Sequence, residues 1–185
     1  MTAVPLLIDA WLSDCGTYRY TLRRTLPGSA VGRLAWVMLN PSKADASKDD
    51  PTIRKVRGFT ERAGYGVFYV VNLFAFRATK PAVLRAMVRD RGLFFAEGPE
   101  NRDAISAVVQ ACDAVVCAWG AEPYAEARGH VAIGFLRTLG KPLLCLGTAK
   151  NGAPLHPLMP SYDGHPLIPF VDGPNACAGT EEKTK

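Results

Sequence analysis

The chain has 185 residues, of which 48% are apolar and 21% charged, and this composition predicts one globular domain with a substantial core. No apolar run approaches the roughly 18 residues that cross a bilayer, which excludes a membrane-spanning protein, and the N-terminus lacks a charged-then-apolar signal pattern. We therefore expect a cytoplasmic protein. The net charge of +5 leaves nucleic acid open as a partner, although basic residues on amphipathic helices are more often a solvated face.

The five cysteines indicate neither a disulfide framework nor a zinc site, because they are odd in number and form no close pair along the sequence. We expect them to be reduced. Cys117 and Cys145 fall in apolar runs and are expected to lie buried in strands.

The first half of the chain predicts two strands and a helix after an edge hairpin. Residues 17–26 alternate loosely and are followed by turn residues at 27–29, which favours an antiparallel hairpin at one edge of the sheet. The apolar run 34–39 predicts a buried strand that ends before Pro41, which has no N–H to donate. Helical spacing over 52–63 predicts a helix capped by Asp49 or Asp50, and 67–71 predicts a second strand.

The second half alternates helices with strands. We expect helices over 81–88 with Thr79 as cap, 100–112 and 126–139, and strands over 114–120 and 142–147, followed by a loop rich in glycine and proline. Strands separated by helices imply right-handed crossovers and a parallel sheet. The prediction is a three-layer α/β domain over residues 1–170, with a mainly parallel four-stranded central sheet, helices on both faces, an N-terminal antiparallel hairpin at one edge, and a flexible tail over 171–185.

Polar residues follow four of the predicted strands. Asn40 precedes Asp45, Asp49 and Asp50; Asn72 precedes Arg77; Trp119 and His156 follow the later strands. Open α/β sheets bind ligands beyond the carboxyl ends of their strands, so we expect these four points to share one pocket. Each residue also has a plain structural interpretation, since asparagine forms turns, aspartate caps helices, and Phe74 and Trp119 are more often core residues.

Several motifs resemble the family of domain of unknown function 1643, a bacterial and phage family without an established activity. The resemblance covers about residues 15–170 and rests on Val37–Ser42, Asp49–Ile53, Gly64–Gly66, Asn72–Thr79, Ala118–Gly120 and His156–Leu158.

A more distant resemblance is to the uracil-DNA glycosylase superfamily. Leu39-Asn40-Pro41 is similar to its first motif, Asn72–Arg77 to a stretch of its iron–sulfur members, and His156-Pro157-Leu158 to its closing His-Pro-Ser motif. Phe76 replaces the cluster cysteine, so no iron–sulfur centre and no other cofactor is expected. Leu158 replaces the serine that contacts DNA phosphate, and Asn40 stands where the strongest glycosylases carry aspartate.

Cleavage of an N-glycosidic bond needs a positioned water, donors for the departing base and an aromatic surface. Asn40, Asp45 or Asp49 would position the water, Asn72 would read a base edge, and His156 would face the developing oxyanion. Phe74 or Trp119 would stack on the base. The remaining expected substrate-binding residues are Pro41, Ser42, Arg77, Pro157 and Leu158.

Three functions stay open at this point. The first is a nucleobase-recognising, glycosylase-like protein without a metal that acts on DNA, a nucleoside or a nucleotide. The second is a metal-dependent phosphoesterase or nuclease with Asp45, Asp49, Asp50 and His156 as ligands. The third is a non-catalytic module that binds a nucleotide, DNA or RNA. The sequence identifies no protein partner.

Overall fold

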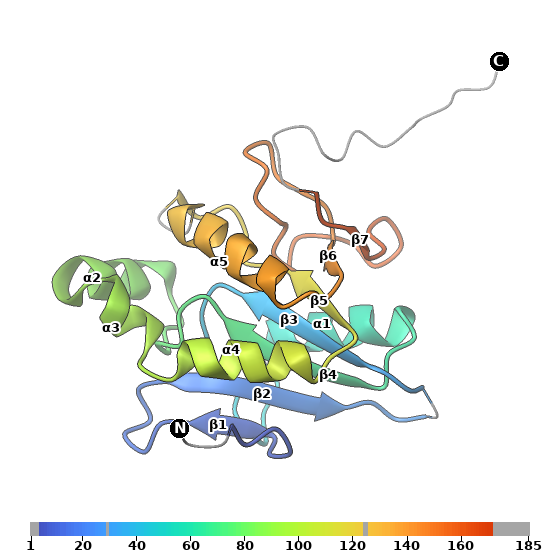
Figure 1. Ribbon diagram of the computed structural model, residues 1–185, viewed down its shortest axis with the longest axis horizontal. Helices are drawn as coiled ribbons and strands as arrows, with labels where there is room; N and C mark the ends of the chain where they lie inside the picture. The colour runs from blue at the N-terminus through green and yellow to red at the C-terminus, as the bar shows by residue number, and fades with distance from the viewer. Residues whose placement is uncertain (1–3, 29, 124–125, 172–185) are drawn as a thin grey trace.

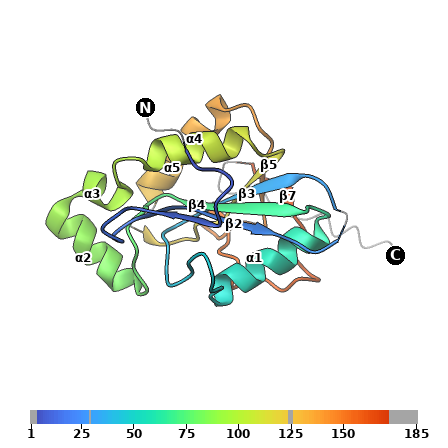
Figure 2. The ribbon, with the colours of Figure 1, turned by 90° about the horizontal axis from the view of Figure 1, so that it is seen from below.

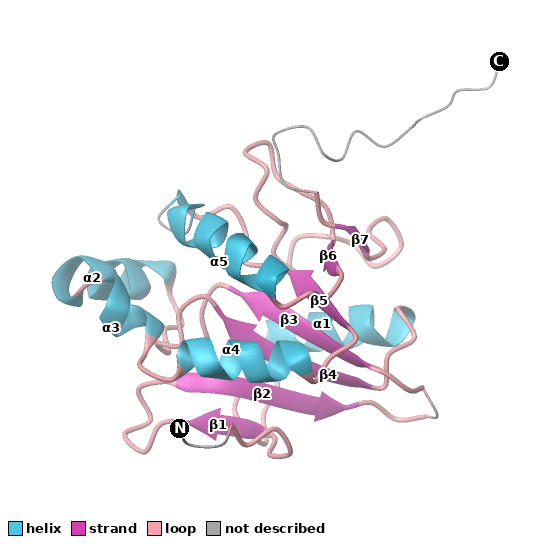
Figure 3. Cartoon of the chain, in the orientation of Figure 1, coloured by secondary structure: helices cyan, strands magenta, loops and turns pink. Residues whose placement is uncertain are grey.

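The computed structural model describes residues 4–28, 30–123 and 126–171, and it shows helices on both faces of one mixed β-sheet (Figures 1 and 3). The strands are β1 (Ala10–Leu12), β2 (Arg19–Thr25), β3 (Arg33–Met38), β4 (Val67–Asn72), β5 (Ala114–Cys117), β6 (Leu143–Cys145) and β7 (Ile168–Pro169). The helices are α1 (Pro51–Arg62), α2 (Pro81–Arg91), α3 (Leu93–Glu97), α4 (Asn101–Gln110) and α5 (Glu126–Thr138).

Within the described residues, the sheet has seven strands in the order β1-β2-β4-β3-β5-β6-β7. Strands β4, β3, β5 and β6 are parallel to one another, whereas β2 pairs antiparallel with β4 and β1 at one edge, and β7 pairs antiparallel with β6 at the other. The predicted mainly parallel four-stranded sheet is therefore wrong for the whole sheet, although a parallel group of four strands forms its centre. The sequence pattern missed β7 because two residues are too short to show any periodicity.

The edge hairpin consists of β1 and β2, and it lies beside β4. Strand β2 is followed in the chain by β3, yet its partners are β1 and β4, since β4 sits between β2 and β3. The turn residues at 27–29 thus connect two strands that do not pair. The pairing of β2 with β4 depends on tertiary contacts between distant parts of the chain, and the turn residues at 27–29 do not predict it.

Two apolar layers hold the helices on the sheet. Helix α1 covers one face, and α4 and α5 cover the other, as the view from below shows (Figure 2). Val56 and Phe59 of α1 pack with Trp36 of β3, whose indole N–H donates to the Thr60 hydroxyl (3.0 Å). On the other face, Val108 of α4 and Leu136 of α5 pack with the strands.

Most of the helix caps and buried residues predicted from local sequence patterns are found in the structure. Asp50 caps α1, and Pro51 is its first residue. Lys80, and not Thr79, is the N-cap of α2. Cys117 in β5 and Cys145 in β6 are buried, as predicted.

None of the helices in the described ranges is long and apolar enough to span a membrane. The predicted flexible tail falls, apart from residue 171, outside the described residues, as does Cys177.

Candidate ligand-binding cleft

A cleft of about 680 Å³ opens beyond the carboxyl ends of β3 and β4. Its walls come from the ends of these strands, from the start of α1, from the segment after β5 and from the loop after β6. Of the residues expected to form a site, six line it: Asn40, Ser42, Asn72, Trp119, His156 and Leu158. Segments more than a hundred residues apart therefore meet at one concave surface.

Asn72 is the last residue of β4 and is 1% exposed. Its amide nitrogen and amide oxygen are both buried, and neither has a hydrogen-bond partner among the described residues. A buried amide left unpaired costs about 1–3 kcal/mol, so such groups are rare in folded proteins. The Asn72 amide is therefore an exception among buried polar groups, and it lies in the lining of the cleft.

The backbone at Asn72 is held from the neighbouring helix. Asn101, the first residue of α4, is 2% exposed and donates from Nδ2 to the carbonyl oxygens of Asn72 (2.9 Å) and Leu73 (3.3 Å). These bonds fix the strand end just where the chain leaves the sheet. Asn72 thus projects from a rigid support.

Asn40 lies at the end of the neighbouring strand β3, and its side chain is oriented by the protein. Its Nδ2 donates to the carbonyl oxygens of Pro41 (3.0 Å) and Ala78 (2.8 Å). Because both amide hydrogens are used in this way, Oδ1 is the group that Asn40 offers as an acceptor to a ligand or water.

His156 lies in the loop after β6 and lines the cleft. Its Nδ1 accepts from the Leu158 N–H (3.3 Å), so the neutral ring carries its proton on Nε2. Burial lowers the pKa of His156 from 6.5, and the nearby negative charge of Asp50 opposes this shift only in part. The imidazole is consequently neutral near pH 7 and donates through Nε2–H.

Of the three predicted aspartates, Asp50 lines the cleft, as does Glu122, whereas Asp45 and Asp49 are not among its lining residues. Asp50 Oδ1 accepts from the Ile53 N–H (2.9 Å) at the start of α1. This confirms the cap that the sequence predicted for Asp49 or Asp50. It also places one acidic side chain beside Asn40 and His156 along the lining.

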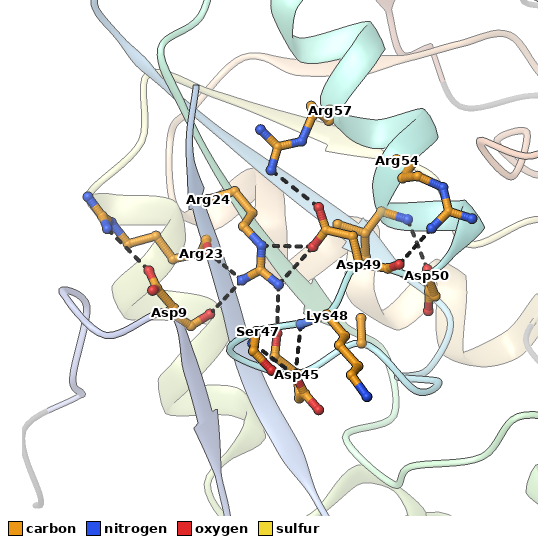
Figure 4. A network of polar contacts seen from close by, with 12 residues as sticks. Asp9, Arg23, Arg24, Asp45, Ser47, Lys48, Asp49, Asp50, Arg54 and Arg57 are labelled. Atoms are coloured by element: carbon orange, nitrogen blue, oxygen red, sulfur yellow. Dashed lines mark hydrogen bonds and ion pairs between the residues drawn. The ribbon is translucent and has the colours of Figure 1, made fainter. Parts of the chain in front are cut away.

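Asp45 and Asp49 are engaged in the loop before α1, where they hold other protein groups (Figure 4). Asp49 binds both Arg24 (2.8 Å) and Arg57 (3.2 Å). Asp45 Oδ1 accepts from the backbone N–H groups of Ser47 and Lys48 (both 2.9 Å), and these bonds lower its pKa. Both aspartates therefore stabilise the loop.

The other expected binding residues lie outside the lining. Phe74 is 0% exposed and packs in the core, which removes it as a stacking surface. Arg77 donates to the Gly16 carbonyl oxygen (3.2 Å), and Pro41 and Pro157 are buried. The sequence left open whether Trp119 is a core residue or a residue of the site. In the structure it is 3% exposed and packs in the core, and it also lines the cleft.

The metal-dependent alternative lacks a ligand set in this arrangement. It needs Asp45, Asp49, Asp50 and His156 to converge, whereas Asp49 is ion-paired and Asp45 closes its own turn. Within the ranges that the structure describes, no group of three or more His, Cys, Asp or Glu side chains is arranged to hold a metal ion.

Arg19 and Glu122 are charged lining residues that the sequence analysis did not predict as part of the site. Arg19 lies on β2, which was predicted as an edge strand, and it is 2% exposed. Its Nη1 donates to the Ala44 carbonyl oxygen (2.8 Å). The only signal in the sequence is an arginine between Tyr18 and Tyr20, two residues that are themselves buried.

Comparison with known proteins gives a family and no function. The chain matches the family described as protein of unknown function (DUF1643) over residues 19–158. No curated protein and no solved structure matches it. The matched range contains β2 to β6 and, from Arg19 to Leu158, nearly the whole lining of the cleft. The chain belongs to this family of unknown function.

Proposed function

We propose that the cleft binds a nucleobase and that the protein hydrolyses the N-glycosidic bond of a nucleotide unit, in DNA or free, as a uracil-DNA glycosylase-like enzyme. The observation that carries the proposal is Asn72 in the cleft lining, whose buried amide finds no partner for its donor or its acceptor in the described part of the chain. A base edge presents donors and acceptors side by side, and an amide matches such a pair with two hydrogen bonds.

The dimensions of the cleft support a ligand of this size. Small-molecule sites typically enclose about 300–1,000 Å³, and this cleft measures about 680 Å³. Its lining combines apolar side chains, among them Met38, Leu39 and Trp119, with a few polar groups. A flipped or free base would bury its ring against the apolar part and present its edge to Asn72.

His156 would stabilise the leaving base. When the glycosidic bond breaks, negative charge develops on the base oxygens, and a donor fixed beforehand stabilises that charge without reorganisation. The neutral His156 ring offers Nε2–H for this role, because Nδ1 is held by the Leu158 N–H. A neutral imidazole donates a hydrogen bond without first taking up a proton.

Asn40 and Asp50 would orient the attacking water. Asn40 offers Oδ1, since its amide nitrogen is held by two carbonyl oxygens. Asp50 lines the same cleft, with Oδ1 held by the Ile53 N–H. Both residues sit on ordered backbone, which favours a defined water position. The resemblance of Leu39-Asn40-Pro41 and His156-Pro157-Leu158 to the glycosylase motifs supports the same roles.

The direct test is release of free base by the purified protein. Oligonucleotides with uracil, hypoxanthine or other modified bases, together with the matching nucleosides and nucleotides, are incubated with wild type and with Asn72→Ala, and released base is quantified by chromatography. We expect release by wild type and a loss of about 100-fold or more in Asn72→Ala, comparable to the loss of one catalytic donor.

The melting temperature of Asn72→Ala should stay close to that of wild type, because the change removes a polar group that has no hydrogen-bond partner among the described residues. Asn151→Ala is the matched control, since Asn151 is an exposed asparagine in the loop that leads to His156. Absence of release and of binding across all substrates would contradict the proposal, as would full activity in Asn72→Ala.

The second candidate is a nucleotide-binding or nucleic-acid-binding module without turnover. Asn40 favours it, because an amide orients water but does not accept a proton as a carboxylate does. Salt-dependent binding that is lost in Asn72→Ala, with no base released, would identify this function in place of hydrolysis.

A further inference from the structure

Arg19 lines the cleft, and Arg77 lies outside the lining on the segment that pairs with the start of β2. The Arg19 N–H donates to the Ala75 carbonyl oxygen (3.0 Å), and the Arg77 N–H donates to that of Thr17 (3.0 Å). Arg19 and Arg77 are near enough for the charge of Arg77 to lower the pKa of Arg19, although burial is the larger cause of that shift. Arg19 donates to the Ala44 carbonyl oxygen, and Arg77 to that of Gly16. The Nε atom of each side chain is buried and has no hydrogen-bond partner within the described residues.

Burial of these guanidinium groups without a carboxylate destabilises the folded protein when no ligand is bound. A buried guanidinium is ordinarily paired with a carboxylate, because loss of hydration outweighs a single bond to a neutral carbonyl. The pKa of Arg19 is about 10, so the side chain remains charged near pH 7. The charges of Asp50 and Asp45 act on it, but across the described ranges no carboxylate forms an ion pair with Arg19 or Arg77.

A β-bulge in the edge hairpin turns the Arg19 side chain toward the cleft. Trp11 is paired with Thr21 and Leu12 with Arg19, so Tyr20 is skipped in the register. Such a bulge re-aims the side chains beside it. Tyr20 packs toward Ala104 of α4, whereas Arg19 reaches Ala44 in the loop on the other side of the sheet.

We infer that Arg19 and Arg77 form an oxyanion subsite that binds a phosphate group of the ligand, with Arg19 in contact with it and Arg77 behind. Guanidinium groups match the spacing of phosphate oxygens with paired hydrogen bonds. The subsite adds to the proposed base recognition: the ligand is a nucleotide unit, as a free monophosphate or as part of a DNA strand, and not a free base or nucleoside.

The first test uses inorganic phosphate, which probes the subsite without a base. Phosphate is added to the full-length protein at constant ionic strength, and the melting temperature is followed, since a ligand that binds the folded state raises it. We expect a rise in wild type, in Asn72→Ala and in Arg23→Met, and none in Arg19→Met. Arg23 is the matched control because it lies on β2 and its Nε is likewise buried without a partner within the described residues, yet it is paired with Asp9 (3.6 Å) and does not line the cleft.

An equal rise in Arg19→Met, or no rise in wild type, would overturn the inference. If Arg19→Met does not fold, the Nε–Hε NMR signal of Arg19 in wild type decides: it should shift in a saturable way with phosphate and not with chloride. Because Asn72→Ala is expected to keep the phosphate response, failure of base recognition and failure of the phosphate subsite are distinguished.

The second test identifies the source of the phosphate. Affinities for a nucleoside, its 5′-monophosphate and a short single-stranded oligonucleotide are compared by calorimetry. We expect wild type to prefer a phosphate-bearing ligand over the nucleoside by about tenfold or more, and Arg19→Met to lose that preference. Preference for the monophosphate indicates a free nucleotide, and preference for the oligonucleotide indicates a DNA strand. A nucleoside that binds as well as both would refute the subsite.

Discussion

The loop before α1 and the cleft lining around Arg19 and Asn72 both contain charged and polar side chains. The side chains of the loop form ion pairs and hydrogen bonds with other protein groups, whereas those of the lining are left partly unpaired within the described residues. In the loop, Asp49 bridges Arg24 and Arg57, and Asp45 closes its own turn (Figure 4). In the cleft lining, the side-chain amide of Asn72 and the Nε of Arg19 have no hydrogen-bond partners within the described residues. The dense run of carboxylates therefore belongs to a structural loop, whereas the candidate site combines a cleft with two unpaired buried side chains in its lining, Arg19 and Asn72.

The contrast holds within a single strand. Arg19 and Arg24 both lie on β2, and both are largely buried. Arg24 forms a charge-assisted pair with Asp49 at 2.8 Å, whereas Arg19 forms one bond to a neutral carbonyl oxygen. Arg24 thus ties the hairpin to the loop, whereas Arg19 is the residue that we propose to contact a phosphate of the ligand.

The largest expected effect is on activity and comes from His156→Ala. Loss of a fixed donor to the leaving base should lower the rate of base release by about 10²–10³-fold, with little change in stability. His130→Ala is the matched control, since His130 is exposed on α5. Rates measured under single-turnover conditions separate this step from product release. Comparable rates in the two variants would remove His156 from the site.

A smaller effect is expected on stability from Asp49→Ala. The change leaves Arg24 and Arg57 without their shared carboxylate and should lower the free energy of unfolding by about 1–3 kcal/mol, below the value for a fully buried pair because Arg57 is partly exposed. Urea unfolding measures this change. Base release per folded molecule should remain at the wild-type level, and a specific loss of activity without destabilisation would place Asp49 in the site instead.

The smallest effect is a pH dependence from His156. Its pKa is lowered from 6.5 in the folded protein by burial, so below pH 6.5 the unfolded chain binds more protons than the folded one. Stability should therefore fall as the pH drops from 6.5 through the lowered pKa, and His156→Ala should lack this component. Base release should persist below pH 6.5 and decline only when the ring is protonated. An NMR titration of His156 with a midpoint at or above 6.5 would contradict this prediction.

The sequence by itself determined the elements whose signals are local. Apolar runs located β3, β4 and β5, and Pro51 with an acidic cap located the start of α1. It also led to Asn40, Asn72 and His156, because the ends of parallel strands meet at one edge of a sheet. These inferences use spacings of a few residues, over which helix and strand periodicity act.

The tertiary structure alone decided which polar groups are paired. Arg24 reaches Asp49 across 25 positions, Asn101 holds the end of β4 across 29, and β2 pairs with β4 although β3 follows it in the chain. Hydrogen-bond satisfaction depends on such distant partners, and so does the bulge that turns Arg19 toward the cleft. For this reason the sequence nominated Asp45, Asp49 and Phe74, which the fold uses for its own stability, and passed over Arg19, whose buried charge follows from the packing of β1, β2 and β4.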